Sequence, residues 1–327
     1  MKILNKIEFW LKAARVHSLP MSFMSWLVVF CWAIKDNGNI FLGVIALIGI
    51  MFAHLGVNLI DDYFDFKDEI KKIKTSEDKK NINMQKGKCQ YLIDGTATLN
   101  QTLAVVIIYF SLAAIIGLVL TLVCGFKVAI IAAISSIFCL LYPKLSYYGL
   151  SEFAVGITFS PLLFAGTYFV MTGHLSLNIL LLSISTGLLT IALLHTHSLM
   201  DYDFDIKVGK KTLCTVLGSK YKAFIALVVM VIAAYINIAV GIVLKIFPIQ
   251  LIITFLTIPL AIILFYQMKQ HIDHPEIVPV RTFWMGPMEN WQSIKDTNAE
   301  SFMLMFYIAR NVMMFFSILL CIGILVS

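Results

Sequence analysis

Long apolar stretches separated by polar ones run through the whole chain, and they set its fold class. Nine of them approach or exceed the roughly 20 residues that a helix needs to cross a bilayer. They cover residues 18–35, 41–60, 101–123, 127–143, 153–172, 176–198, 223–244, 248–267 and 303–326, and the fourth is the shortest. Runs of this length exclude barrel strands. We therefore predict an all-α polytopic membrane protein with nine transmembrane helices.

The composition agrees with this prediction, with 60% hydrophobic and 13% charged residues and a mean hydropathy of +0.88. No segment reads as a separate soluble module, so we predict one membrane-embedded domain over residues 1–327. Three connections stand out by length, at about 61–100, 201–222 and 267–300. The first two both begin with aspartates, and we expect them to cap one cavity. The third is an extra loop, either a lid or an interfacial anchor.

The basic residues orient the chain in the membrane. Twenty-one lysines and arginines fall on the N-terminal segment and on the connections after even-numbered spans. The opposite side carries only Lys35, Lys127 and Lys245, and Arg310 lies inside the last span. Such a bias marks the cytoplasmic side, so both acidic connections are expected to open to the cytoplasm. A basic face beside anionic lipid also accounts for the net charge of +6, without a nucleic-acid partner.

An acidic cluster follows the second apolar stretch, where carboxylates at membrane depth are costly and usually functional. Asn58, Asp62, Asp65 and Glu69 are spaced i, i+4, i+7 and i+11, which places them on one face of a helix. Asp61 lies beside that face. Like charges at this spacing destabilise a helix, so a compensating cation is expected.

A second acidic cluster follows the sixth stretch, where Asp201 and Asp205 are again spaced i, i+4. Two carboxylate sets that face one cavity are typical ligands for Mg²⁺, which binds through a few carboxylates together with substrate phosphates. Two other interpretations stay open. The acids can simply mark helix ends in the headgroup layer, or they can form the ion pathway of an ion-coupled transporter.

Beyond the acids, the chain resembles the UbiA superfamily of intramembrane prenyltransferases over nearly its whole length. The first family motif, Asn-Asp-x-x-Asp-x-x-x-Asp, reads here Asp61-Asp62-Tyr-Phe-Asp65-Phe-Lys-Asp-Glu69, and the second, Asp-x-x-x-Asp, is Asp201 and Asp205. Within the superfamily the chain most resembles the menaquinone-pathway dihydroxynaphthoate prenyltransferases. Four stretches carry this closer match: 14–20, 58–65, 148–152 with 166–173, and 209–213.

The resemblance implies a fold, a reaction and a set of site residues. It implies nine helices around a central cavity, in a bacterial or archaeal cell membrane, and Mg²⁺-dependent transfer of an isoprenyl chain from a prenyl diphosphate to a lipophilic aromatic acceptor. The expected metal ligands are Asp61, Asp62, Asp65, Glu69, Asp201 and Asp205, and the central four (Asp62, Asp65, Asp201, Asp205) are also the expected catalytic residues. The residues expected around the diphosphate are Arg15, Asn58, Lys88, Tyr142, Lys144 and Lys211. Four aromatic residues are candidates for the wall of a dry cavity: Phe64, Phe159, Tyr168 and Phe169.

Three positions depart from the family pattern. Asp61 stands where the family has asparagine, Gln90 where it has arginine, and Met200 where an arginine precedes the second motif. Lys88 is close enough in sequence to replace the missing arginine. Because of these changes, a UbiA-type enzyme with another lipophilic acceptor, or one that cyclises the prenyl chain, remains an alternative.

Overall fold

The computed structural model describes residues 3–75, 89–145, 148–207, 209–277, 279–295, 297 and 299–327. The side chains of residues 3, 4, 68–75 and 143 are also outside this description. Two predicted site residues are affected, because Lys88 is not described and Glu69 is described only as part of a helix.

All regular secondary structure in the described part of the chain is helical, in agreement with the predicted class. Eight helical stretches are long and apolar enough to cross a membrane, and Lys127–Tyr142 adds a shorter apolar one. This is the pattern expected from the sequence, including the weak fourth span. The helices of the first half are α1 Ile3–Ala13, η1 Val16–Ser18, α2 Pro20–Lys35, α3 Ile40–Thr75, α4 Gln90–Ile93, α5 Leu99–Cys124, α6 Lys127–Leu145, α7 Ser151–Ile157, the π-helical turn η3 Thr158–Leu162 and α8 Leu163–Thr172. Those of the second half are α9 Leu177–Met200, α10 Tyr202–Lys207, α11 Leu213–Leu217, α12 Lys220–Val243, η4 Ile249–Thr257, α13 Ile258–Asp273, η5 Phe283–Met285, α14 Trp291–Ile294 and α15 Glu300–Leu325.

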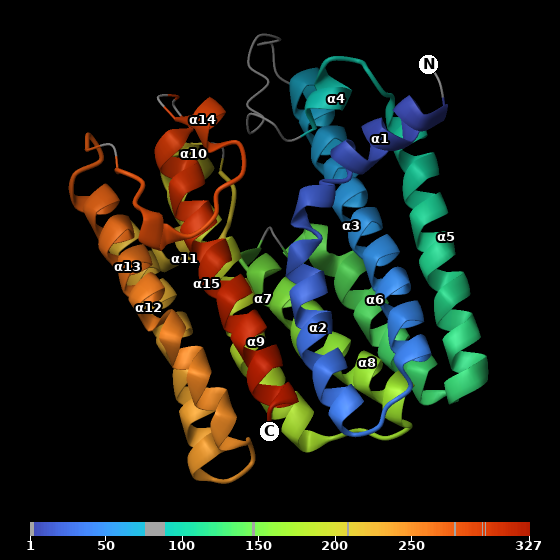
Figure 1. The fold of residues 1–327 in the computed structure, drawn as a ribbon. Coiled ribbons are helices and arrows are strands. Elements are labelled where there is room, and N and C mark those ends of the chain that lie inside the picture. The colour runs from blue at the N-terminus through green and yellow to red at the C-terminus, as the bar shows by residue number, and fades with distance from the viewer. Residues whose placement is uncertain are drawn as a thin grey trace.

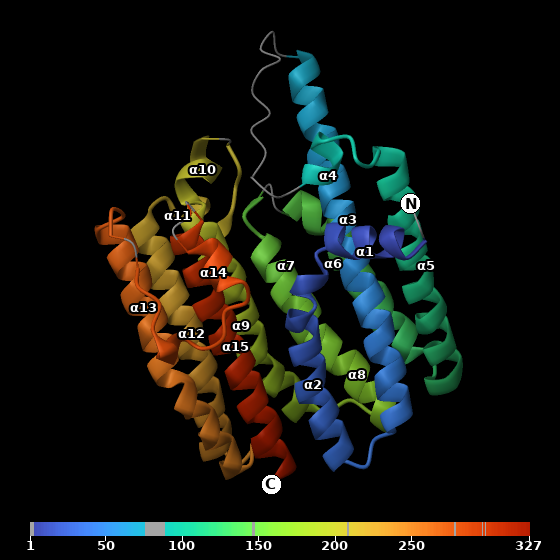
Figure 2. The ribbon, with the colours of Figure 1, turned by 45° about the horizontal axis from the view of Figure 1, so that its top comes forward.

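The long helices stand side by side, with α3 and α5 at one side of the molecule and α12 and α13 at the other (Figures 1 and 2). Helix α3 packs against α5, α9 against α12, and α15 against both α2 and α9. The short helices α4, α10 and α14 gather at the end where the N-terminus lies, and the C-terminus lies at the opposite end (Figure 1). The second half of α3 and the end of α9 therefore reach the same end of the molecule.

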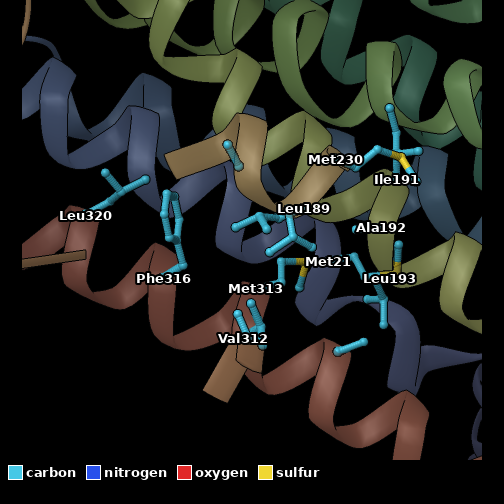
Figure 3. Close-up of a cluster of buried hydrophobic side chains, with 14 of the residues drawn as sticks. Met21, Leu189, Ile191, Ala192, Leu193, Met230, Val312, Met313, Phe316 and Leu320 are labelled. Atoms are coloured by element: carbon cyan, nitrogen blue, oxygen red, sulfur yellow. The ribbon is translucent and has the colours of Figure 1, made fainter. Parts of the chain in front are cut away.

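The largest apolar core joins α2, α8, α9, α12, α13 and α15. Figure 3 shows its centre, where Leu189 and Leu193 of α9 lie among Met21 of α2 and Met313 and Phe316 of α15. Many outward side chains are apolar as well, and α5 is apolar on all sides, with few of its residues buried. A helix without a polar face suits lipid contact.

Helix α3 is longer than the membrane is thick. Its 36 residues span about 54 Å, against roughly 30 Å of hydrocarbon. The helix therefore extends its acidic second half beyond the length needed to cross the membrane, without a break. Helix α9 behaves differently, because it ends at Met200 and the chain turns at Asp201 into the short helix α10.

Candidate active site

The first acidic cluster lies on the unbroken helix α3, so the predicted spacing of Asn58, Asp62 and Asp65 along one helical face is confirmed. Asp61 and Asp62 are 5% and 1% exposed, respectively. Buried carboxylates are stable only with partners. A cation is therefore expected within contact of this pair.

Arg15 is that cation. Its guanidinium forms an ion pair with Asp62, lies 3.7 Å from Asp61 Oδ2, and donates a 3.4 Å hydrogen bond to the carbonyl of Asn58. Burial alone would lower the pKa of Arg15, but Asp62 and Asp61 raise it above its usual value. The residue adopts a left-handed backbone with φ 56°, a conformation that is uncommon for residues other than glycine and is found at turns and at functional sites. The sequence placed Arg15 near a diphosphate, and the structure places it on the carboxylates.

A series of hydrogen bonds between α3 and the turn after α1 holds this arginine in position. The amide nitrogen of Asn58 donates to the carbonyl of Ala14 at 2.9 Å and to Ser18 Oγ at 3.0 Å. One turn before Asn58 on α3, the buried His54 contacts Ser18 Oγ through Nε2 at 3.1 Å and Ser22 Oγ through Nδ1 at 2.9 Å. The amide nitrogen of Asn58, a predicted diphosphate ligand, is thus engaged in fixing the turn that carries Arg15.

The second acidic cluster is built on the break between α9 and α10. The backbone N–H of Asp205 donates to the carbonyl of Asp201 at 2.8 Å, so the i, i+4 relation predicted from the sequence holds across the break. Asp201 Oδ2 lies 3.3 Å from Nδ1 of His197. Asp205 is fully buried, and neither of its carboxylate oxygens accepts a hydrogen bond from the described part of the chain.

Within the described residues, Lys210 forms an ion pair with Asp205, with Nζ 3.6 Å from Oδ1. Burial raises the pKa of Asp205, and Lys210 and Thr212 act in the opposite direction. The attraction at this distance only partly offsets the cost of burying a carboxylate. Asp205 therefore has the capacity to accept a further cation.

Three further residues expected around the diphosphate fall in different settings. Lys211 lines a cavity of about 460 Å³, together with Lys210, Tyr148 and Thr215. Tyr142 lies near enough to Arg15 to contribute to the raised pKa of its guanidinium. Lys144 is exposed in the last turn of α6. The Tyr142 and Lys211 positions remain consistent with a diphosphate near the two clusters.

The sequence reasoning missed Glu152, which is 3% exposed at the start of α7. Its Oε1 accepts hydrogen bonds from Ser198 Oγ at 3.1 Å and from the backbone N–H of Leu213 at 3.4 Å, and Ser151 Oγ donates to Oε2 at 3.1 Å. Glu152 thereby ties α7 and α9 to the loop that carries Lys210. An acid at the first turn of an apolar span was the available signal.

The aromatic candidates separate into two groups. Phe159 packs on His54, with ring centroids 4.7 Å apart, and Phe64 is 40% exposed on the second half of α3. Tyr168 instead donates a 2.6 Å hydrogen bond to Asp36, beyond the far end of α2. Phe169 packs in a separate apolar cluster with Ala46 and Val128. Of the four, Phe159 and Phe64 lie toward the acidic clusters. Tyr168 and Phe169 lie on α8, toward the opposite end of the molecule.

Histidines near the second cluster have structural partners. His195 is fully buried and contacts the carbonyl of Ala223 at 2.8 Å through Nε2, beside Cys214. His197 stacks edge-on against Phe302 and faces Asp201. His197 is therefore the histidine that belongs to the site.

Magnesium suits this donor set. Among the described residues, no group of three or more His, Cys, Asp or Glu side chains lies close enough together to hold a metal ion by itself. Mg²⁺ does not need such a cage, because it retains waters and binds through one or two carboxylates plus substrate phosphates. The carboxylate of Asp205, which has the 3.6 Å ion pair with Lys210 but accepts no hydrogen bond within the described residues, fits one such contact.

Comparison with known proteins identifies the family. The family model described as UbiA prenyltransferase family matches residues 21–286. The chain belongs to the UbiA prenyltransferase family. This confirms the resemblance read from the motifs, and it favours an enzyme over an ion-coupled transporter.

Two relatives narrow the position within the UbiA family. The chain is 30% identical over 135 residues to a 2-carboxy-1,4-naphthoquinone phytyltransferase of Synechocystis sp., covering 41% of this chain and 44% of that protein. It is 28% identical over 233 residues to a 1,4-dihydroxy-2-naphthoate octaprenyltransferase of Haemophilus influenzae, covering 67% of this chain and 72% of that one. The chain thus spans less than half of the first relative. The predicted enzyme class, a prenyltransferase, agrees with both.

Two solved structures share the fold. A UbiA homolog from Aeropyrum pernix K1 matches with a TM-score of 0.66 at 15% identity, over 95% of this chain and 98% of that one. A UbiA homolog from Archaeoglobus fulgidus, bound to GPP and Mg²⁺, matches with a TM-score of 0.59 at 13% identity, over 97% and 99%. The UbiA fold predicted from the sequence is therefore confirmed.

Proposed function

We propose that the protein transfers an isoprenyl chain from a prenyl diphosphate to an aromatic quinone precursor, with Mg²⁺ as cofactor. A 1,4-dihydroxy-2-naphthoate-type acceptor has the strongest support, because both relatives are named for naphthoate or naphthoquinone substrates. The observation that carries the metal is the buried Asp205, whose oxygens lack hydrogen bonds within the described residues.

Asp62 and Asp65 on α3, and Asp201 and Asp205 at the α9–α10 break, would hold Mg²⁺ on the diphosphate, with Asp61 and Glu69 at the edge of the first group. When bound, Mg²⁺ would neutralise the charge that develops on the departing diphosphate. Lys211 and Lys210 carry point charges that attract the same phosphates. Their contribution is electrostatic stabilisation of the transition state.

Arg15 has two alternative partners in this scheme. In the free protein it neutralises Asp62, and an arriving diphosphate offers its guanidinium bidentate acceptors. Movement of Arg15 toward phosphate would leave Asp62 available to a metal ion. The left-handed turn held by Asn58 and His54 keeps this arginine within reach of both partners.

The cation left on the prenyl chain requires a site that excludes water. Phe159 and the apolar faces around it supply such surroundings on the inner side of the first cluster. An aromatic ring also stabilises a nearby cation through its π-face. The acceptor ring would attack from this dry side.

Product mass spectrometry tests this function. Purified protein in detergent receives 1,4-dihydroxy-2-naphthoate and, in separate reactions, prenyl diphosphates of different length. We expect a prenylated form of the acceptor, with or without its carboxyl group, together with released diphosphate. Diphosphate release without any adduct of the acceptor would indicate cyclisation or another acceptor, and no turnover of any prenyl diphosphate would contradict the proposal.

A further inference from the structure

The connection between α13 and α15 does not rise away from the membrane. Figure 1 shows the chain turning back beside α13 and α15 before it reaches α14. The turned-back part, residues 279–291, contains the short helix η5 and packs against α13 and α15. We call it the returning segment.

Three residues on one face of α15 hold the returning segment. Arg310 forms an ion pair with Glu289 and donates a 3.0 Å hydrogen bond to the carbonyl of Pro287. The buried Asn311 donates to the carbonyls of Met285 at 2.8 Å and Pro287 at 3.0 Å, and Tyr307 donates to that of Glu289 at 2.9 Å. Their spacing of i, i+3 and i+4 places all three on one side of the helix.

Close packing also fixes this contact. Gly286 has φ +83°, and a Cβ added there would meet Asn311 Nδ2 at 2.9 Å and Phe315 Cε2 at 3.0 Å. Glycine is therefore required on both conformational and steric grounds. Met285 is 1% exposed and Trp291 is 6% exposed, so one side of the segment is fully packed onto the helices.

The contact between the returning segment and α15 lies well inside this transmembrane helix, away from its first residue. Arg310 comes ten residues after Glu300, the first residue of α15, which corresponds to about 15 Å along the helix axis. An arginine inside a span is costly unless a partner offsets its charge. Glu289 and the carbonyl of Pro287 offset it, which accounts for a charged residue in an otherwise apolar stretch.

The other side of the segment is apolar and open. Phe283 is 88% exposed and Trp284 is 76% exposed, and Val280 beside them is 77% exposed. Large aromatic residues in this number are unusual on a surface that faces water. Tryptophan in particular is enriched at the membrane–water boundary.

We propose that the returning segment is a membrane anchor, whose Phe283–Trp284 tip enters the lipid at the cytoplasmic boundary. Its partner is the bilayer itself. The segment is held to α15 by Arg310, Asn311 and Tyr307, and it presents its apolar side outward. Of the two roles expected for the extra loop, this geometry selects the anchor and not a lid over the acidic clusters.

Tryptophan fluorescence in reconstituted vesicles tests the anchor. The protein has five tryptophans, so the emission of Trp284 is obtained as the difference between the unmodified protein and Trp284→Phe. Phosphatidylcholine brominated on the acyl chain is the lipid-side quencher, and iodide is the aqueous one. We expect brominated lipid to remove most of the Trp284 emission and iodide to remove little of it.

Trp291→Phe is the matched control, because Trp291 belongs to the same segment but is buried; its emission should resist both quenchers. Arg310→Met should loosen the segment and raise iodide quenching of Trp284. Strong iodide quenching of Trp284 in the unmodified protein, without quenching by brominated lipid, would overturn the anchor. A change in Trp284 emission on adding prenyl diphosphate and Mg²⁺ would instead favour a lid. None of these readouts depends on prenyl transfer.

Discussion

The two acidic clusters share one chemistry but differ in their electrostatic state. On α3, Asp61 and Asp62 are neutralised by Arg15, which a ladder of hydrogen bonds holds in position. At the α9–α10 break, Asp205 is buried with a lysine at 3.6 Å and no hydrogen bond to its oxygens from the described residues. The first cluster is therefore already compensated, whereas the second is prepared for an arriving cation.

This difference separates stability from activity in the two clusters. Removing a carboxylate that has a buried partner leaves that partner uncompensated, whereas removing a poorly paired carboxylate relieves an electrostatic cost. Substitutions in the two clusters should therefore impair the reaction alike but affect the stability of the fold in opposite directions.

The largest effect is expected for Asp205→Asn. Loss of this carboxylate should lower the rate of prenyl transfer on the order of 10²- to 10³-fold, the range seen when one stabilising group is removed from a transition state. The midpoint of thermal unfolding in detergent should stay the same or rise. Asp203→Asn is the matched control, since Asp203 is exposed and pairs with Lys220; its rate should not change. A large drop in the unfolding midpoint of Asp205→Asn would break the comparison.

Asp62→Asn should cost stability as well as activity. Arg15 would keep its charge without its main partner, and breaking a buried pair in this way costs about 3 kcal/mol. Thermal unfolding of the two single variants and of Asp62→Asn with Arg15→Met measures the coupling. The double variant should recover much of the lost stability and none of the activity. A loss of stability in the double variant that equals the sum of the two single losses would show that the pair contributes nothing.

Glu152→Gln should weaken substrate binding more than turnover. Glutamine is neutral and retains only one acceptor oxygen, so the hydrogen bonds from Ser198 and Leu213 lose their charge assistance and the one from Ser151 must reverse its direction, at about 1–3 kcal/mol in all. The loop with Lys210 and Lys211 should then loosen. We expect a higher KM for prenyl diphosphate and faster trypsin cleavage at these lysines, while Ser151→Ala changes both less. Unchanged cleavage would exclude a positioning role.

The smallest effect is expected for Ser18→Ala, which removes the hydroxyl between Asn58 and His54. The loss should be about 1 kcal/mol in unfolding free energy, because a typical hydrogen bond contributes that much. Affinity for prenyl diphosphate should fall slightly, through Arg15. Chemical denaturation and KM measure the two effects, and Ser136→Ala on the exposed side of α6 is the control. A fall in the rate of prenyl transfer as large as that of Asp62→Asn would place Ser18 in the reaction itself.

Much of this architecture could be predicted from the sequence. Apolar length alone located the spans, including the short one at Lys127–Tyr142, because a bilayer leaves the backbone few alternatives. Helical spacing correctly placed Asn58, Asp62 and Asp65 on one face. These features depend on local pattern, which a sequence carries directly.

What the sequence could not provide were partners that are far apart along the chain. Arg15 reaches Asp62 across 47 positions, and Leu213 reaches Glu152 across 61. Motif spacing contains no information on such contacts, so the ion pair of Arg15 with Asp62 was not expected and Glu152 was missed. Tyr168 and Phe169 were candidates for the cavity wall because they are aromatic. They lie instead toward the end of the molecule that is opposite to the acidic clusters. The role of Arg310 likewise became apparent only with Glu289 and Pro287 beside it.

The most direct test of the central claim is Mg²⁺-dependent release of diphosphate from a long prenyl diphosphate by the purified protein, measured with acceptor present. We predict release that stops on adding EDTA, returns with excess Mg²⁺, and is lost in both Asp65→Ala and Asp201→Ala, one substitution from each cluster. Release that persists in both variants would contradict a metal site shared between the two acidic clusters.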